Sequence, residues 1–188
     1  MSRSTNYSLI ENPPELLAMK KLPSTLYATG KTSLLNKQKI SIVGSRKPSS
    51  YSRTQIHTLA SLLGKQNIVV VSGGAIGIDA LAHLGAGACN TIAVLPCGIN
   101  ERYPSINKKL LDDIASEGLL LSHFEPDFQA RPWSFVERNE IVVAPGDVLV
   151  VAEADVDSGT MRSVEFALKM KKEIFGESMT LELVQNED

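Results

Sequence analysis

Three short segments of the chain combine glycine with serine or threonine, and their residue types suit the binding of phosphate. They are Gly44-Ser45-Arg46-Lys47-Pro48, Ser72-Gly73-Gly74-Ala75-Ile76-Gly77 and Ser158-Gly159-Thr160. Small side chains let backbone N–H groups approach an anion closely, and a helix that begins at such a loop adds about half a positive charge. Arg46 and Lys47 supply formal charge, the arginine in bidentate fashion. The sequence therefore predicts an anion site.

The loops lack two known phosphate-binding motifs, and this limits which phosphate-bearing ligands the site could bind. A dinucleotide site needs G-x-G-x-x-G after the first strand, where this chain reads Gly44-Ser45-Arg46. A P-loop needs a lysine directly after G-x-x-x-x-G, and no segment has that spacing. These absences disfavour NAD, FAD and P-loop ATP chemistry, and we expect no cofactor.

From residue 40 onward, apolar runs alternate with amphipathic stretches, and this alternation must position the loops. The runs are 40–43, 68–71, 91–95, 119–121, 148–151 and 173–175. Apolar residues at helical spacing predict helices over 49–63, 77–85, 106–114, 134–143 and 161–168. Continuously apolar runs are typical of strands buried on both faces of a parallel sheet. We expect a three-layer, doubly wound α/β domain with a mainly parallel sheet, and with the loops at its carboxyl edge, where such folds bind ligands.

The predicted domain covers residues 40–177 and is flanked by two short segments. Residues 1–39 form a lead-in that prolines break up, with room for a short helix over 16–22. Residues 178–188 are polar and acidic, and we expect a tail or an edge strand there. A chain of 188 residues is long enough for one domain with its own core.

The net charge of −2 conceals an uneven distribution along the chain. Leu16 to Ile78 carries nine lysines and arginines and no acid, whereas Asp79 to Asp188 carries nine basic and nineteen acidic residues. If this separation persists in space, one side of the surface is basic and suits an anionic polymer. The alternative is that these lysines are scattered over the surface and solvated.

Two groups of ionisable residues could serve catalysis or metal binding, but a structural role is favoured for each. Asp79 and His83 share a helical face and could form an acid–base pair. A structural role is favoured for them, because no nucleophile motif accompanies them. Glu153, Asp155 and Asp157 could hold Mg²⁺, but a solvated acidic turn is favoured.

The remaining ligand-type residues indicate neither a metal nor a disulfide. Cys89 and Cys97 fit no common zinc spacing, and we interpret both as buried thiols. His57 and His123 show no ligand spacing, so we expect no metal site. Nothing near the N-terminus resembles a signal peptide, and no apolar run approaches the ~20 residues that cross a bilayer. A soluble, cytoplasmic protein without a membrane partner is the simplest expectation.

Several strings resemble the DNA-processing protein A (DprA/Smf) family, in the same order, from Tyr7 to Phe175. The most specific is Ser72–His83, and the others are Gly44-Ser45-Arg46, Leu95-Pro96-Cys97-Gly98 with Tyr103-Pro104, Phe135 with Arg138-Asn139, and Ser158-Gly159-Thr160. The resemblance implies an extended Rossmann-like core that binds single-stranded DNA. It also implies delivery of the recombinase RecA in natural transformation, and homodimers. On this basis we expect a binding protein without catalytic residues.

The resemblance further implies roles for individual residues. Arg46 would hold phosphate, and Phe135 would stack on a base, a contact worth roughly 1–3 kcal/mol. The spacing of Phe135 to Val142 also fits packing in the core. The predicted site comprises Ser45, Arg46 and Lys47, then Gly73, Gly74 and Ala75, which would offer backbone amides, and finally Ser134, Phe135, Arg138, Asn139, Ser158, Gly159 and Thr160.

Three departures from the family pattern bear on function. The family usually reads Arg-Asn-Arg where this chain has Arg138-Asn139-Glu140, which would cost the pocket a cation if the third residue faced it. After Thr160 the chain continues with Met161-Arg162 in place of small apolar residues. Many members carry a winged-helix-like domain after the Rossmann core, and we expect this chain to be too short to hold one.

Two other functions stay open. One is a nucleotide-binding or nucleotide-hydrolysing protein similar to the phosphoribohydrolases, which share the fold type and a Ser-Gly-Gly loop. Their Pro-Gly-Gly-x-Gly-Thr-x-x-Glu string is absent here, because Ser163 stands at the spacing of the glutamate and Glu165 comes two places late. The other is a family relative that has lost its DNA function, for which Glu140 is the main reason.

Overall fold

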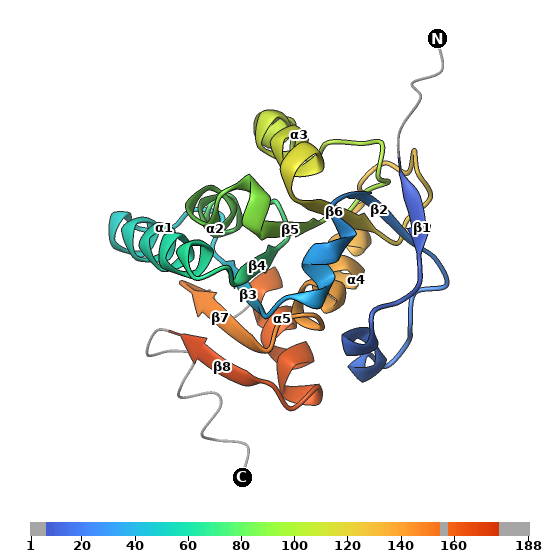
Figure 1. Ribbon diagram of the computed structural model, residues 1–188. Coiled ribbons are helices and arrows are strands. Elements are labelled where there is room, and N and C mark those ends of the chain that lie inside the picture. Colours follow the sequence, from blue (N-terminus) through green and yellow to red (C-terminus); the bar gives the residue numbers. More distant parts are fainter. Residues whose placement is uncertain (1–6, 155–157, 177–188) are drawn as a thin grey trace.

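In the computed structural model, the described residues, 7–154 and 158–176, form an eight-stranded sheet with helices on both faces (Figure 1). The strand order is β1-β2-β6-β5-β4-β3-β7-β8, and the strands from β3 to β8 run parallel. These are β3 (Lys39–Gly44), β4 (Val69–Ser72), β5 (Thr91–Val94), β6 (Leu119–Ser122), β7 (Val148–Ala152) and β8 (Glu173–Gly176). The predicted doubly wound, mainly parallel α/β fold is confirmed.

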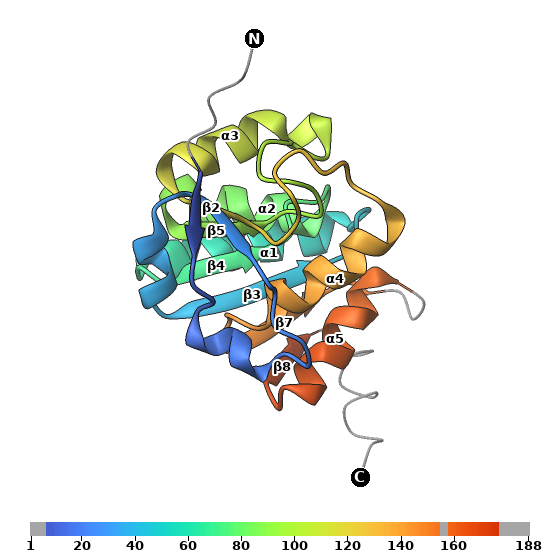
Figure 2. The same cartoon turned by 90° about the vertical axis from the view of Figure 1, so that its right-hand side faces the viewer.

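The helices cover the two faces of the sheet in separate groups (Figure 2). One face carries α1 (Ser50–Lys65), α2 (Ile78–Ala86) and α3 (Lys108–Glu117), and the other carries α4 (Pro132–Val143) and α5 (Gly159–Lys169). Successive strand residues serve opposite faces: Val70 packs in the cluster of α1 and α2, and Val71 in that of α4 and α5. Among the helices of the described residues, none is both long and apolar enough to span a membrane.

The lead-in forms part of the sheet. Its strands β1 (Ser8–Ile10) and β2 (Leu26–Gly30) run antiparallel, and β2 pairs with β6, so that Tyr27 lies opposite Ser122. The helix expected over 16–22 is a 3-10 helix at Pro14–Ala18, and a second one follows at Thr32–Asn36. The predicted boundary at residue 40 therefore separates stretches of chain that share one sheet. The acidic segment 178–188 lies outside the described residues.

The chain changes its direction across the sheet at β3. From β3 it proceeds through β4 and β5 to β6, and then returns to place β7 on the other side of β3. Such a switch point, beyond the carboxyl ends of the strands, is where open α/β sheets bind ligands. The loop after β3 and the start of α5 both lie there, as the strand assignments predicted.

Candidate nucleic-acid interface

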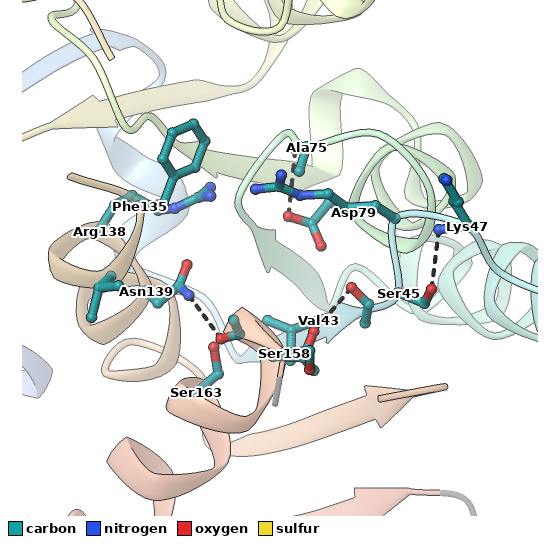
Figure 3. A pocket seen from close by; sticks show the side chains of 15 residues that line it. Val43, Ser45, Lys47, Ala75, Asp79, Phe135, Arg138, Asn139, Ser158 and Ser163 are labelled. Atoms are coloured by element: carbon teal, nitrogen blue, oxygen red, sulfur yellow. Dashed lines mark hydrogen bonds between the residues drawn. The ribbon is translucent and has the colours of Figure 1, made fainter. Parts of the chain in front are cut away.

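A pocket of about 420 Å³ lies at the carboxyl ends of β3 and β7, beside α4 and the start of α5 (Figure 3). From the predicted site it brings together Ser45, Arg46, Lys47, Ala75, Phe135, Arg138, Asn139, Ser158, Gly159 and Thr160. Gly73, Gly74 and Ser134 are not among its lining residues. The pocket is also lined by Gly44, which precedes Ser45 in the first glycine segment, and by four residues outside the predicted site, Val43, Asp79, Val136 and Ser163.

The loop after β3 has a fixed backbone and two free cationic side chains. The Ser45 amide donates to the carbonyl of Ala152 at 3.1 Å, and the Ser45 carbonyl accepts from the amide of Ile78 at 3.1 Å. The Ser45 hydroxyl accepts from the amide of Lys47 at 3.0 Å. Arg46 and Lys47 are exposed, and within the described residues neither forms an ion pair.

Gly77 allows the second glycine loop to approach the first. Its φ is +82°, a backbone conformation that residues with a side chain rarely adopt. An added Cβ would lie 2.7 Å from the Cα of Arg46. A larger residue at this position would push the two loops apart, so Gly77 helps to define the wall of the pocket.

Phe135 lies on the opposite side of the pocket from Lys47 (Figure 3). Its ring is partly buried and lies 5.3 Å from the guanidinium carbon of Arg46 and 5.9 Å from that of Arg138. Tyr103 contacts the same ring edge-on, at 5.5 Å between centroids. Phe135 thus belongs to the pocket, whereas Val142, on the same helix, is 1% exposed and packs in the core.

Arg138 differs from Arg46 in being buried beneath the pocket. Its side chain is 3% exposed, and Nη1 donates to the carbonyls of Gly73 and Val94, the latter at 3.0 Å. Burial lowers the pKa of the guanidinium and the neighbouring Asp79 raises it, and an arginine stays charged in either case. Arg138 therefore joins the ends of β4 and β5, which is a structural role that the resemblance did not imply.

Asp79 occupies backbone amides that the sequence analysis assigned to DNA. Its Oδ2 accepts from the amide of Gly73 at 3.1 Å and from that of Ala75 at 3.4 Å. Burial raises the pKa of this carboxyl, and Arg138 and the two amides oppose the rise. In this structure an internal carboxylate accepts from the N–H groups of Gly73 and Ala75, and their predicted role toward DNA stays a prediction. Gly74 is buried outside the pocket.

His83 is a core residue and not the partner of Asp79. Its side chain is 0% exposed, and its Nδ1 lies 2.5 Å from the hydroxyl of Thr91, which itself donates to the carbonyl of Val70. Since the threonine has one hydrogen to donate, Nδ1 carries the imidazole proton. Burial lowers the pKa of His83 to about 3. This arrangement agrees with the structural interpretation of the pair.

Ser134 belongs to the start of α4 and not to the pocket. It is 0% exposed, and its hydroxyl donates to the carbonyl of Pro96 at 2.6 Å and accepts from the amide of Arg131 at 3.0 Å. It stands at the third position of the helix, and its bond from the Arg131 amide satisfies the backbone donor that precedes the helix. The predicted phosphate contact is wrong for this residue, because the fold uses its hydroxyl.

The start of α5 contributes polar groups to the pocket. The N-terminus of this helix of 11 residues carries about half a positive charge. The Asn139 side chain donates to the carbonyl of Gly159 at 3.1 Å, and the Thr160 hydroxyl donates to that of Gly44 at 3.1 Å. The buried hydroxyl of Ser158 has no hydrogen-bond partner among the described residues. The helix start is thus fixed against α4 and β3.

Glu140 stands where the family usually has an arginine, and this difference was the main argument against DNA binding. Its side chain does not line the pocket. Its Oε1 accepts from the backbone amide of Lys20 at 3.2 Å. The side chain therefore fastens the lead-in to α4, and its negative charge is directed at the lead-in.

Other charges near the strand ends are engaged in the same way. Glu153 accepts from the amide of Ser49 at 2.7 Å at the start of α1, and this bond lowers the pKa of the carboxyl. Arg162 pairs with Glu165 at 2.9 Å on the exposed side of α5. The rest of the predicted acidic turn, residues 155 and 157, lies outside the described residues.

The two cysteines occupy different environments. Cys97 is 1% exposed, and burial raises the pKa of its thiol to about 11. Cys89 is exposed in the short connection between α2 and β5, so the prediction of a buried thiol is wrong for it.

Sequence reasoning missed Asp79 and Tyr103 as parts of the site. Asp79 follows Gly73 by six residues and stands in the first turn of α2, where a carboxylate can turn back to the amides before the helix. That spacing is a usable sequence signal. Tyr103 belongs to the Tyr103-Pro104 string of the family resemblance, but nothing in the sequence indicates its contact with Phe135, which lies on a different element.

Fold and pocket together define a class of protein. A doubly wound α/β sheet with a cationic pocket at its switch point, closed by a helix N-terminus, is typical of proteins that bind phosphate-bearing ligands. A family model for DNA recombination-mediator protein A matches residues 6–186. The chain belongs to this family.

Two curated relatives show how similar the sequence is to other members of the family. The DNA processing protein DprA of Bacillus subtilis (strain 168) is 33% identical over 156 residues, which are 81% of this chain and 52% of the relative. That of Streptococcus pneumoniae (strain ATCC BAA-255 / R6) is 32% identical over 174 residues, which are 90% of this chain and 61% of the relative. The chain thus spans less than two thirds of the length of these curated relatives.

Solved structures agree with this assignment. DNA processing protein A from Helicobacter pylori, solved to explain its unique mode of binding single-stranded DNA, is 40% identical with a TM-score of 0.89, over 94% of this chain and 82% of that one. DprA from Streptococcus pneumoniae is 31% identical with a TM-score of 0.86, over 94% and 66%. A molybdenum cofactor binding protein from Rippkaea orientalis, at 21% identity and a TM-score of 0.59 over 80% of this chain and 83% of that one, shares the fold.

Proposed function

We propose that this protein binds single-stranded DNA at the pocket and catalyses no reaction there. Arg46 and Lys47 hold phosphates, and a base lies near Phe135. The observation that carries the proposal is the pair of exposed cations, without ion-pair partners among the described residues, at a pocket that a helix N-terminus closes. The single-stranded DNA binding of the Helicobacter pylori relative supports the same ligand.

The charges of the pocket favour a polyanion over a small substrate that needs acid–base chemistry. Among the described lining residues, Asp79 is the sole acid, against the cations Arg46, Lys47 and Arg138. The carboxylate of Asp79 is already bound by two amides, so it is poorly suited to act as a base. This supports a binding protein over a phosphoribohydrolase-like enzyme.

The structure also weakens the case for a relative that has lost its DNA function. That hypothesis depended on an anion replacing a cation in the pocket. Glu140 instead accepts a hydrogen bond from Lys20, so its carboxylate does not oppose a phosphate in the pocket.

We extend the proposal to the wider role of the family. On this proposal the protein assists the loading of RecA onto single strands in natural transformation or recombination, acts as a homodimer, and works in the cytoplasm. Family membership supports this role. A pull-down of RecA on immobilised strands, with and without the protein, tests the first part, and sedimentation tests the second.

The test of DNA binding is a fluorescence-anisotropy titration of labelled oligothymidine at two salt concentrations. Arg46→Ala and Lys47→Ala should each weaken binding roughly tenfold, the scale of a hydrogen bond to a charged group. Each should also reduce the slope of log affinity against log salt by about 0.7, the value for one phosphate of a single strand. The matched control is Lys65→Ala, since Lys65 is exposed in the last turn of α1, at the other edge of the sheet.

An affinity that is weakened in the two pocket variants and unchanged in Lys65→Ala supports the proposal. A folded parent protein that does not bind oligothymidine overturns it. Equal losses in all three variants would mean diffuse electrostatic attraction and would overturn the pocket as the binding site.

A further inference from the structure

Phe135 offers little free aromatic surface to a base. Its ring is partly buried, and its neighbours are the guanidinium groups of Arg46 and Arg138 and the edge-on ring of Tyr103. Three groups therefore already lie beside this ring, which limits the surface that a stacking base can use. A second aromatic ring beside Phe135 would extend the surface on which bases can stack.

Tyr103 is the exposed member of this aromatic pair. Its side chain is 46% exposed, and it comes from the loop between β5 and α3. Ile106, three residues on, is 79% exposed, and Ile76 in the neighbouring glycine loop is 40% exposed. An exposed aromatic ring thus contacts a ring that lines the cationic pocket, and aromatic rings beside cations are the combination that single-stranded nucleic acid binds.

The residues on both sides of Tyr103 are anchored. Arg102 donates to the carbonyl of Ile99 at 2.8 Å and pairs with Asp112 at 2.8 Å. Asn107 donates to the carbonyl of Gly74 at 3.0 Å and so ties this loop to the glycine loop. A ring held in place before binding loses little conformational entropy when a base stacks on it.

We propose that Tyr103 is a base-stacking residue, and that the strand leaves the phosphate pocket past Phe135 and across Tyr103. The inference rests on the proposed function, since the phosphates are held at Arg46. A second exposed tyrosine follows the loop after β3, since Tyr51 is 67% exposed in the first turn of α1. Within the described residues no aromatic ring supports Tyr51, whereas Phe135 supports Tyr103.

The experiment is a titration of oligothymidine, and of the same strand with abasic sites in place of its bases, by the parent protein and its variants. Tyr103→Ala should weaken binding to oligothymidine roughly 5- to 150-fold, the range of base–aromatic stacking. It should change binding to the abasic strand less than twofold. Tyr103→Phe, which keeps the ring, and Tyr51→Ala, which removes the exposed tyrosine of α1, should bind both strands like the parent.

The outcomes separate this inference from the function on which it rests. If Arg46→Ala loses binding and Tyr103→Ala does not, the pocket stands and the path across Tyr103 is overturned. Equal losses of Tyr103→Ala on both strands also overturn it, because they indicate a structural effect. A loss confined to Tyr51→Ala reverses the path, and a parent protein that does not bind overturns both proposals.

A second measurement does not depend on whether Tyr103→Ala folds. Oligothymidine with 5-iodouracil in place of thymine is irradiated in complex with the parent protein, and the crosslinked peptide is identified by mass spectrometry. A crosslink at Tyr103 supports the inference. Crosslinks only at Phe135 or at Tyr51 overturn it.

Discussion

Two arginines approach the same phenylalanine ring from different environments, and replacing each should separate folding from binding. Arg46 is exposed and has no ion pair within the described residues, whereas Arg138 is 3% exposed and donates to two backbone carbonyls. The informative change is Arg138→Met, which keeps much of the volume of the side chain and removes its charge. Arg46→Ala is the matched change at the surface.

The structure sets the size of the effect. Arg138→Met leaves the buried carbonyls of Gly73 and Val94 without this donor, at about 1–3 kcal/mol for each unsatisfied group. It also leaves the buried carboxylate of Asp79 without its neighbouring cation. Removing one partner of a buried charge pair costs about 3–5 kcal/mol, and we expect the unfolding free energy to fall by that amount. Arg46→Ala should change it by no more than about 0.5 kcal/mol.

Urea unfolding at pH 7 measures both variants, with the single tryptophan, Trp133 in α4, as the fluorescent probe. Asp79→Asn combined with Arg138→Met should recover part of the loss, since it removes the uncompensated charge. If Arg138→Met costs less than about 1 kcal/mol and weakens DNA binding as much as Arg46→Ala, the reasoning is refuted. Arg138 would then be a ligand contact that the fold does not need.

Three further results are expected. The folded pKa of His83 is about 3 against an ordinary 6.5, so only the unfolded chain takes up this proton as the pH falls from 7 to 5. Lowering the pH from 7 to 5 should therefore reduce the unfolding free energy of the parent by about 2 kcal/mol, and His83→Gln should lack this reduction. Urea titrations at the two pH values that give the same reduction for the parent and for His83→Gln would contradict this. Gly77→Ala should weaken oligothymidine binding by moving the loop after β3, whereas Gly87→Ala, also at positive φ but with open space around its Cβ, should bind like the parent. Glu140→Ala should leave the affinity within twofold, because its partner is the Lys20 amide, and a clear gain in affinity would show that the carboxylate does oppose DNA.

Much of the fold was predictable from the sequence, and the reason is burial. Each parallel strand is short and is covered on both faces, so its residues form an unbroken apolar run, as in Val69-Val70-Val71. The lead-in strands escaped prediction because β1 has only 3 residues and β2 lies among prolines and polar residues. The strand that pairs with β2, β6, is about ninety positions away in the sequence, and no local pattern indicates this pairing.

The sequence by itself also predicted where the candidate site would lie. Glycine, hydroxyl and cationic residues follow β3, β4 and β7, and parallel strands bring their carboxyl ends to one edge. Arg46 and Lys47 therefore could be assigned to a common pocket with the start of α5. This much follows from the parallel direction of the strands, which the apolar pattern indicates, whereas the order of the strands came from the structure.

Only the tertiary structure decided which polar groups remain available to a ligand. Gly73 and Ala75 lose their amides to Asp79, Arg138 turns inward to two carbonyls, and Ser134 caps its own helix. A buried polar group must find a partner within the fold, and several of these partners come from distant parts of the chain. A sequence motif gives the residue types of a site, but the packing of the elements decides which of them face the ligand.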